Sequence, residues 1–444
     1  MGLPVVHPQA LDGGDVRNVR GDPITGDRFW SKEFAQKEWD HMWKRVWHVA
    51  GRTNQLQEPG DYVIHDFMHE SVICVLQDDG SIRAFYNACR HRGQRLVWND
   101  GCQEAFTCAY HGWVWGKDGL LQDAPDPETF PQGDPIGTLR LKELQCDTWG
   151  GFIWYSMDPN APPLMEFLAP IPELYKHWPW EKLVRVTNLT IEMECNWKFA
   201  SENFSESYHT RTAHPQVPAW IDQDHWTSVF EMFPMGHGRI VQPGRPSLRD
   251  VPPEGEAAPF DSFLTPWGID PSKYASYEEK VTQGYQDLID AKKRLWREKG
   301  YLHYENLVDG ELVDSPHNVV FPNVTLSVLP DDVIFFRTEP HPDNPEKCTF
   351  DLWHMVFPVE GITDVETMHG PRKVEEAAYE RRAFDRGRGV PEMHGQIVFQ
   401  DLSLAEGQQR GWRSQGYEDA YLSSQEVRVR RWHEVLNDYI EGRR

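Results

Sequence analysis

The hydrophobic and polar positions divide the chain into stretches with different periodicities. Residues 30–47 carry apolar side chains at helical spacing, and Ser31 can cap their start, so we predict a helix there. Residues 48–160 consist of short alternating apolar runs, separated by turn signals such as Glu-Pro-Gly at 58–60 and Asp-Asp-Gly at 78–80. This pattern is typical of a small antiparallel β domain.

A proline-rich stretch at 158–163 marks a boundary, and the pattern after it is mixed. We predict helices near 197–212, 273–298 and 372–386, and strands near 183–195, 318–328, 333–338 and 349–357. The stretch 243–266 holds six prolines and is expected to form a loop or to be partly disordered. Ser423 opens a capping box before an amphipathic helix that runs to Ile440.

These patterns predict the α+β class, with a small antiparallel β domain inserted in or preceding a larger α+β domain. We assign 1–45 to an N-terminal helical segment that packs on the larger domain, 46–160 to the β domain and 161–444 to the larger domain. A length of 444 residues agrees with more than one domain, because single cores stop growing at about 250–300 residues.

Composition excludes several classes of protein. The chain has 45 Lys+Arg against 69 Asp+Glu, a formal charge of -24, which argues against nucleic-acid binding because phosphate contacts need a basic face. A hydrophobic content of 39% excludes wholesale disorder, and the lack of an 18-residue apolar run predicts no membrane span. Seven cysteines, an odd number, with no secretory signal at the N-terminus indicate a reducing, cytoplasmic location.

The β domain contains a spaced set of cysteines and histidines. Cys89-Arg-His91 is followed after 16 residues by Cys108-Ala-Tyr-His111, so each half offers one thiolate and one imidazole. A Rieske [2Fe–2S] cluster needs this set, because one iron takes both sulfurs and the other takes both nitrogens. The alternative is a structural zinc site, although zinc fingers usually pair Cys with Cys and His with His in much smaller modules.

A second constellation lies in the larger domain. His209 and His214 are five residues apart, which an ideal helix would place about 140° apart around its axis. They can share one metal only if the helix loosens or ends there, and Pro215 supplies a break. Glu206 falls on the face of His209 and can accept the proton of its other ring nitrogen. The alternative is a pair of helix histidines whose hydrogen bonds are satisfied without a metal.

The Cys-X-His-X16-Cys-X2-His motif resembles the Rieske domain of bacterial Rieske non-haem iron oxygenases, in their catalytic α subunit. Respiratory Rieske proteins carry an extra cysteine in each cluster loop, and here the loops continue without one, at 92–94 and 112–114. The resemblance covers about residues 40–440. It implies that the larger domain is a helix-grip-like catalytic domain with mononuclear iron.

The resemblance also implies the ligands. The [2Fe–2S] cluster would be bound by Cys89, His91, Cys108 and His111, and Fe(II) by His209, His214 and Asp401. Asp401 matches because Glu406 follows it by five residues, as in the family, although Gln400 stands where the preceding residue is usually acidic. A surface or capping role is the alternative for Asp401.

The resemblance implies a catalytic role for Glu206. The family carboxylate at this position bridges a Rieske histidine of one subunit to an iron histidine of its neighbour, which maps here to His111, Glu206 and His209. This bridge requires a ring of subunits, usually a homotrimer, with or without a separate β subunit. Glutamate in place of the more common aspartate resembles a branch that includes oxygenases of carnitine and betaine.

The resulting prediction is the terminal oxygenase component of a multicomponent Rieske system. It would use O2 and electrons from NAD(P)H, delivered by a flavin reductase and/or a ferredoxin, to hydroxylate a small aromatic compound. The alternatives are oxidative demethylation or oxidation of a quaternary ammonium compound, an electron-transfer Rieske protein, and a zinc-stabilised binding protein. Five basic residues against two acidic ones within 83–117 can either dock an acidic ferredoxin or pair with neighbours. Three aromatic residues can line the pocket or belong to the core: Phe204, Trp220 and Phe399.

Overall fold

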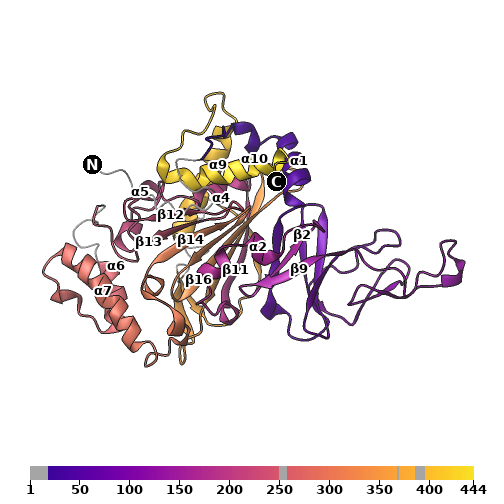
Figure 1. Ribbon diagram of the computed structural model, residues 1–444, viewed down its shortest axis with the longest axis horizontal. Coiled ribbons are helices and arrows are strands. Elements are labelled where there is room, and N and C mark those ends of the chain that lie inside the picture. Colours follow the sequence, from indigo (N-terminus) through magenta and orange to yellow (C-terminus); the bar gives the residue numbers. More distant parts are fainter. Residues whose placement is uncertain (1–18, 250–257, 368–369, 386–395) are drawn as a thin grey trace. The chain divides into compact units, whose positions relative to one another are not determined.

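The computed structural model describes residues 19–249, 258–367, 370–385 and 396–444 (Figure 1). Its compact parts are two units. One is formed by Glu38–Leu168, and the other by Ala169–Arg444 together with the N-terminal segment up to Lys37. The first 18 residues of the predicted N-terminal segment, and residues 250–257 of the predicted loop, lie outside the described residues.

The strands of the smaller unit pair antiparallel in both of its sheets. The seven-stranded sheet has the order β1-β10-β9-β4-β3-β2-β5, and a three-stranded sheet has the order β6-β7-β8. The strands are β1 (Trp47–Arg52), β2 (Asp61–Phe67), β3 (Glu70–Leu76), β4 (Ile82–Tyr86), β5 (Gly101–Cys102), β6 (Ala105–Thr107), β7 (Val114–Gly116), β8 (Leu121–Asp123), β9 (Glu143–Trp149) and β10 (Phe152–Ser156), and a short helix α2 (Leu164–Phe167) follows. The predicted small antiparallel β domain is confirmed.

Both faces of the larger sheet in this unit are packed. In β3, Ile73 and Val75 join the core that also holds Cys89 and Cys108, whereas Val72 and Cys74 join a separate core on the opposite face. Successive side chains of a strand point to opposite faces, so the apolar run at 72–75 fills both cores. The first cysteine loop follows β4 of this sheet, which is packed on both faces, and the second lies between β6 and β7 of the three-stranded sheet.

The larger unit is built on an eight-stranded sheet of order β12-β13-β14-β15-β16-β17-β11-β20. All its pairings are antiparallel except that of β20 with β11. Its strands are β11 (Val184–Met193), β12 (Val229–Met232), β13 (Gly238–Gln242), β14 (Ser315–Val320), β15 (Val324–Val328), β16 (Asp332–Pro340), β17 (Cys348–Val356) and β20 (Glu380–Ala383), with β18 (Asp364–Thr367) and β19 (Gly370–Lys373) forming a separate hairpin. The predicted α+β class is confirmed.

The larger unit also contains helices. They are α1 (Lys32–Glu38), α3 (Ile171–Leu174), α4 (Lys198–Asn203), α5 (Thr210–Ala213), α6 (Ala258–Leu264), α7 (Tyr277–Leu295), α9 (Gln396–Trp412) and α10 (Val427–Ile440). Of these helices, α4 and α10 contact strands of this sheet. In Figure 1, α4, α9 and α10 lie along one side of the sheet, and α4 contacts both β16 and α9. Phe29 of the N-terminal segment stacks on Trp412 of α9, with ring centroids 3.7 Å apart, so this segment supports the helix that carries Asp401.

Several predicted elements differ from the observed ones. The predicted helix at 372–386 is wrong: within its described part, β19 pairs with β18, and β20 pairs in parallel with the edge of β11. Backbone pairing at a sheet edge outweighs the local helical preference of this charged segment. The predicted strand at 318–328 is a hairpin of β14 and β15, and the predicted helix at 197–212 is divided into α4 and α5.

Candidate metal centres and substrate pocket

The two cysteine loops have the same backbone pattern. In the first loop, Gly93 N–H donates to the Cys89 carbonyl at 2.9 Å, and Cys89 N–H donates to the carbonyl of residue 94 at 2.8 Å. In the second, Gly112 N–H donates to the Cys108 carbonyl at 2.9 Å, and Cys108 N–H to the carbonyl of residue 113 at 2.8 Å. Both glycines have positive φ, +78° and +72°, which an L side chain adopts only with strain. The repeated turn presents one thiol and one imidazole from each loop.

The donor atoms of these loops fit a cluster of two irons. The Cys89 and Cys108 side chains are 2% exposed, and burial together with the neighbouring Cys108 thiol raises the pKa of Cys89. The His91 and His111 rings lie 4.5 Å apart between centroids, and the buried Nδ1 of each has no hydrogen-bond partner among the protein atoms. Unpartnered buried nitrogens beside paired thiols fit the ligand set of a Rieske cluster.

A single zinc ion fits these four residues poorly. A tetrahedral ion would draw all four donors to one centre. Among the residues that the structure describes, the group of three or more His, Cys, Asp or Glu donors within 4.8 Å of one another is a different one, His209, His214 and Asp401. The cysteine and histidine pairs of the loops therefore match two metal atoms better than one.

The segment around His209 and His214 breaks out of helical geometry, as predicted. His209 is the residue before the single turn of α5, and His214 ends that turn with φ −129° and ψ 63°. The non-helical backbone at His214, followed by Pro215, brings the two imidazoles to one side despite their five-residue spacing. Their ring centroids lie 5.2 Å apart at an interplanar angle of 81°.

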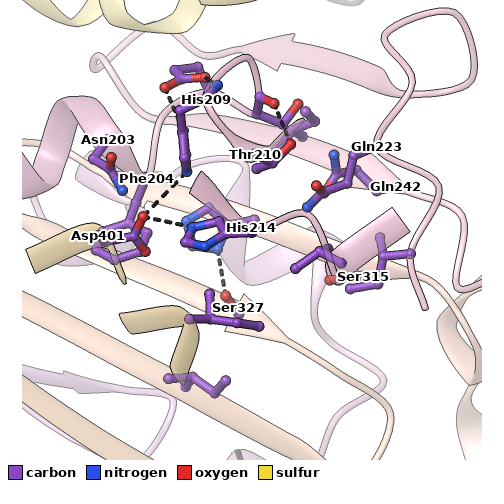
Figure 2. A pocket seen from close by; sticks show the side chains of 18 of the residues that line it. Asn203, Phe204, His209, Thr210, His214, Gln223, Gln242, Ser315, Ser327 and Asp401 are labelled. Carbon is purple, nitrogen blue, oxygen red and sulfur yellow. Dashed lines mark hydrogen bonds and ion pairs between the residues drawn. The ribbon is translucent and has the colours of Figure 1, made fainter. Parts of the chain in front are cut away.

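Asp401 joins the two histidines from α9. Its Oδ1 lies 2.8 Å from His214 Nε2 and 3.4 Å from His209 Nε2, and Figure 2 shows dashed lines that join the carboxylate to both rings. The Asp401 side chain is 2% exposed. Two imidazole nitrogens and one carboxylate oxygen that converge in this way fit the facial triad of a non-haem Fe(II) site, with positions left for oxygen and substrate.

The Nδ1 atoms of His209 and His214 also form hydrogen bonds. His209 Nδ1–H donates to Glu206 Oε1 at 2.6 Å, and His214 Nδ1–H donates to Gln400 Oε1 at 2.8 Å. Gln216 Nε2 donates to the same Gln400 oxygen at 2.9 Å, which fixes the orientation of the Gln400 amide. Such contacts select the tautomer whose Nε2 lone pair faces the metal.

Electrostatics in this site favour a bound cation. Burial alone would lower the pKa of His209, but hydrogen bonds to Asp401 and Glu206 outweigh burial and raise it to about 10. Burial alone would raise the pKa of Asp401, and its hydrogen bonds to both histidines keep it below the usual range. The carboxylate is therefore charged at neutral pH, and a metal ion held by this group would displace a proton from His209.

A pocket of about 160 Å³ opens beside the candidate iron ligands His209, His214 and Asp401. Its apolar lining consists of Phe204, Val217, Ile221, Ile240, Leu329, Ile334, Phe336, Ile397 and Val398. Its polar lining beyond the iron ligands and Glu206 consists of Asn203, Ser207, Thr210, Gln223, Gln242, Ser315, His317 and Ser327. Of the three aromatic residues predicted as candidates, Phe204 lines this pocket, whereas Trp220 and Phe399 are not among the described residues that do.

Local charge around the cysteine loops is largely paired. Arg83, Arg95 and Lys117 each form an ion pair with a neighbouring carboxylate, at 2.6, 3.0 and 2.8 Å. Arg92 lies over the Tyr110 ring, and Arg90 donates to a backbone carbonyl. Of the two interpretations offered for this basic excess, pairing with neighbours accounts for three of the five cations.

Sequence reasoning missed the contacts made by glutamines. Gln400 appeared only as a departure from an acidic residue, and Gln216, Gln223 and Gln242 carried no motif. The position of Gln400 next to a candidate ligand is a usable signal, because residues beside metal ligands often orient them. The other three depend on which side chains the sheet and loops bring to the pocket.

Two converging metal-binding sets, one in an antiparallel β unit and one beside an apolar pocket, define the class of Rieske proteins that also carry a mononuclear iron. Residues 46–141 match the model of the Rieske [2Fe–2S] domain, and residues 180–442 match that of the ring hydroxylating alpha subunit, catalytic domain. The chain belongs to the ring-hydroxylating alpha-subunit family and carries both of its iron cofactor domains.

Relatives with curated functions include aromatic dioxygenases and a carnitine monooxygenase. The chain is 35% identical over 191 residues to the large oxygenase component of the naphthalene 1,2-dioxygenase system of Pseudomonas putida, which covers 41% of this chain and 42% of that relative. It is 26% identical over 293 residues to the carnitine monooxygenase oxygenase subunit of Escherichia coli K12, covering 64% and 75%. The chain thus spans less than half the length of the naphthalene relative, and the two kinds of relative differ in substrate.

Solved structures share the fold. A quaternary ammonium Rieske monooxygenase superposes with a TM-score of 0.67 at 18% identity, covering 96% of this chain and 97% of the other. Naphthalene 1,2-dioxygenase with indole bound superposes with a TM-score of 0.61 at 20% identity, covering 92% and 90%. None of the helices that the structure describes is both long enough and apolar enough to cross a membrane.

Proposed function

We propose that this chain is the terminal oxygenase component of a multicomponent Rieske system that uses O2 to hydroxylate a small aromatic compound. The observation that carries the proposal is the pocket beside the iron triad. Nine of its lining residues are apolar, and its described lining contains no lysine or arginine. The apolar side chains supply most of the surface of the pocket, which suits an uncharged ring compound.

The proposal assigns roles to the residues and domains predicted from sequence. Cys89, His91, Cys108 and His111 hold the cluster in a domain at 46–160, and His209, His214 and Asp401 hold Fe(II) in a domain at 161–444, on which the segment 1–45 packs. When bound, the cluster supplies electrons one at a time and Fe(II) activates O2.

The chain's own residues prepare the site for this chemistry. His209, His214 and Asp401 would hold the metal, and all three line the pocket, so O2 and substrate would reach a metal held there from the pocket. Phe204 and Phe336 stack on each other, with centroids 4.5 Å apart, and form an apolar wall. This wall excludes water and holds the plane of an aromatic ring beside the iron ligands.

Glu206 is proposed to connect the two centres between subunits. It holds His209 Nδ1 at 2.6 Å, and the neighbouring Tyr208 is 55% exposed, so this segment reaches the surface of the unit. A His111 ring from a second copy could then meet the same carboxylate in a homotrimer, with or without a β subunit. Electrons would come from NAD(P)H through a flavin reductase and/or a ferredoxin.

Oxidation or demethylation of a quaternary ammonium compound is the second candidate. Glu206 and the longer alignment with carnitine monooxygenase favour it. A carnitine-like substrate carries a carboxylate as well as a cation, however, and buried charges require partners. The absence of lysine and arginine from the described lining favours the aromatic substrate.

A single-turnover experiment separates these candidates. The holoenzyme is reduced, mixed with oxygenated buffer, and followed by the visible absorbance of the cluster, with toluene, L-carnitine or no substrate present. We expect toluene to accelerate cluster reoxidation and L-carnitine to leave it unchanged. Acceleration by L-carnitine alone would contradict the aromatic proposal.

A further inference from the structure

The substrate pocket contains polar atoms that no protein group satisfies. Four of them are Asn203 Nδ2, Ser207 Oγ, Gln223 Oε1 and Gln242 Nε2. Each is buried and lacks a hydrogen-bond partner within the described part of the chain. Buried polar atoms are nearly always hydrogen-bonded, so a group of them in one pocket points to a bound molecule that supplies the partners.

The two glutamines lie on the side of the pocket away from Asp401. In Figure 2, Gln223 and Gln242 are drawn on the opposite side of His214 from Asp401. Gln242 is at the end of β13, where it pairs in register with Ser315 of β14, and Gln223 comes from the segment before β12. One amide presents an unpartnered donor and the other an unpartnered acceptor. A ligand group that both accepts and donates would satisfy the two amides together.

The pocket offers no charge at this end. Its described lining has no lysine or arginine, and its carboxylates are Glu206 and Asp401, which are bonded to the iron-site histidines. Burial lowers the pKa of His317 to about 3, so this ring is neutral at physiological pH, and its Nδ1 is bonded to Ser327 at 2.5 Å. Arg428, whose charge also lowers the pKa of His317, lines a separate pocket. A carboxylate or an ammonium group bound here would therefore meet no counter-charge within the described lining.

Building on the proposed function, we propose that Gln223 and Gln242 select an aromatic substrate that bears an uncharged substituent able to accept and donate hydrogen bonds, such as a carboxamide. The apolar wall holds the ring, and the amide pair binds the substituent at the end away from Asp401. A plain hydrocarbon leaves both glutamine amides unsatisfied, and a charged substituent is not neutralised. The site therefore distinguishes substrates by their substituent more than by their ring.

Binding of three probes with the same ring and similar size tests this inference. Benzamide, toluene and benzoate are titrated anaerobically into the holoenzyme by calorimetry, with L-carnitine as a fourth probe. We expect benzamide to bind roughly tenfold more tightly than toluene, and benzoate to bind more weakly than benzamide. Equal or tighter binding of toluene, or tightest binding of benzoate, would overturn the inference while leaving an aromatic oxygenase intact.

Two variants test whether the glutamine amides cause the preference for benzamide. Gln242→Leu and Gln223→Leu should each weaken benzamide binding roughly tenfold and leave toluene binding unchanged or tighter, a reversal that general unfolding cannot produce. Gln286→Leu, on the exposed side of α7, is the matched control and should change neither. Unchanged benzamide binding in both pocket variants would overturn the inference. Binding of L-carnitine without either neutral aromatic probe would instead contradict the proposed function, and with it this inference.

Discussion

The two metal-binding regions each contain a histidine pair, but they present opposite ring nitrogens to the centre. In the cysteine loops, the Nδ1 atoms of His91 and His111 are buried and have no hydrogen-bond partner among the residues that the structure describes. In the iron site, both Nε2 atoms face Asp401, and the Nδ1 atoms are bonded to Glu206 and Gln400. Imidazole can bind a metal through either nitrogen, and the hydrogen bond made by the other one decides which is used.

This difference separates two ways of building a metal site. The loop site depends on local backbone, because two turns with equivalent hydrogen bonds carry all four donors within 89–111. The iron site depends on side chains from distant segments, because Asp401 is 187 residues from His214. The loop site should therefore be sensitive to backbone strain, and the iron site to the residues that orient its ligands.

We expect the largest effect from variants that remove one of the two metal sites and leave the other intact. Asp401→Ala removes the only carboxylate of the described iron triad, so we expect iron occupancy to fall to a small fraction of wild type. Turnover should fall by more than about 100-fold, which exceeds the usual effect of residues that only orient a ligand. Metal analysis together with the visible spectrum of the cluster checks this.

The reciprocal variant is Cys108→Ser, which should remove the cluster spectrum and retain mononuclear iron. If Asp401→Ala keeps full iron occupancy, the third ligand lies elsewhere in the chain. If either variant loses both metals, the two regions are not independent and the comparison fails.

Glu206 is expected to have the next largest effect. Glu206→Gln keeps an acceptor for His209 Nδ1 but removes the negative charge, so both metals should remain. We expect turnover to fall about 100-fold because the proposed bridge between centres needs the carboxylate. Single-turnover reoxidation of the cluster measures this step directly, and normal turnover in the variant would contradict the bridge.

The same contrast explains which metal ligands could be predicted from the sequence. The loop donors lie so close in sequence that their spacing alone indicates a cluster, and the pair His209 and His214 with Pro215 indicates a helix that ends at a metal. Asp401 came only from the resemblance, since no local pattern links it to residues 187 positions away. The acceptor role of Gln400 depends on how the His214 ring is turned, which is a tertiary property.

Fold prediction failed for a similar reason. The strands at 183–195, 333–338 and 349–357 were predictable because their apolar runs are buried in the sheet as β11, β16 and β17. Residues 380–383 are all exposed and three of them are charged, and they become β20 only because the edge of β11 is available for pairing. Hydrophobic periodicity reflects which side chains are buried, and β20 has almost no buried side chains.

A smaller effect is expected at Gln400. Gln400→Leu leaves His214 Nδ1 without its acceptor, so iron affinity should fall about 10- to 100-fold while the cluster is unchanged. Gln400→Glu supplies an acceptor again and should restore the affinity. Anaerobic Fe(II) titration of the iron-free protein measures both, and an unchanged affinity in Gln400→Leu would show that His214 needs no such support.

The smallest effect tests the backbone half of the comparison. Gly93 has φ +78° and no atom within 4 Å of an added Cβ, so Gly93→Ala introduces conformational strain without a clash. The cost should be roughly 1 kcal/mol, which lowers the melting temperature of the protein by about 2–4 °C. Because Gly93 N–H donates a hydrogen bond to the Cys89 carbonyl, we also expect incomplete cluster loading.

Gly133→Ala is the matched control, since Gly133 has φ +93° and equally open surroundings, and no metal ligand lies in its turn. It should lower the melting temperature to a similar degree and leave the cluster spectrum at full intensity. Equal cluster loss in both variants would mean that general destabilisation, and not the geometry of the cysteine loop, controls cluster binding.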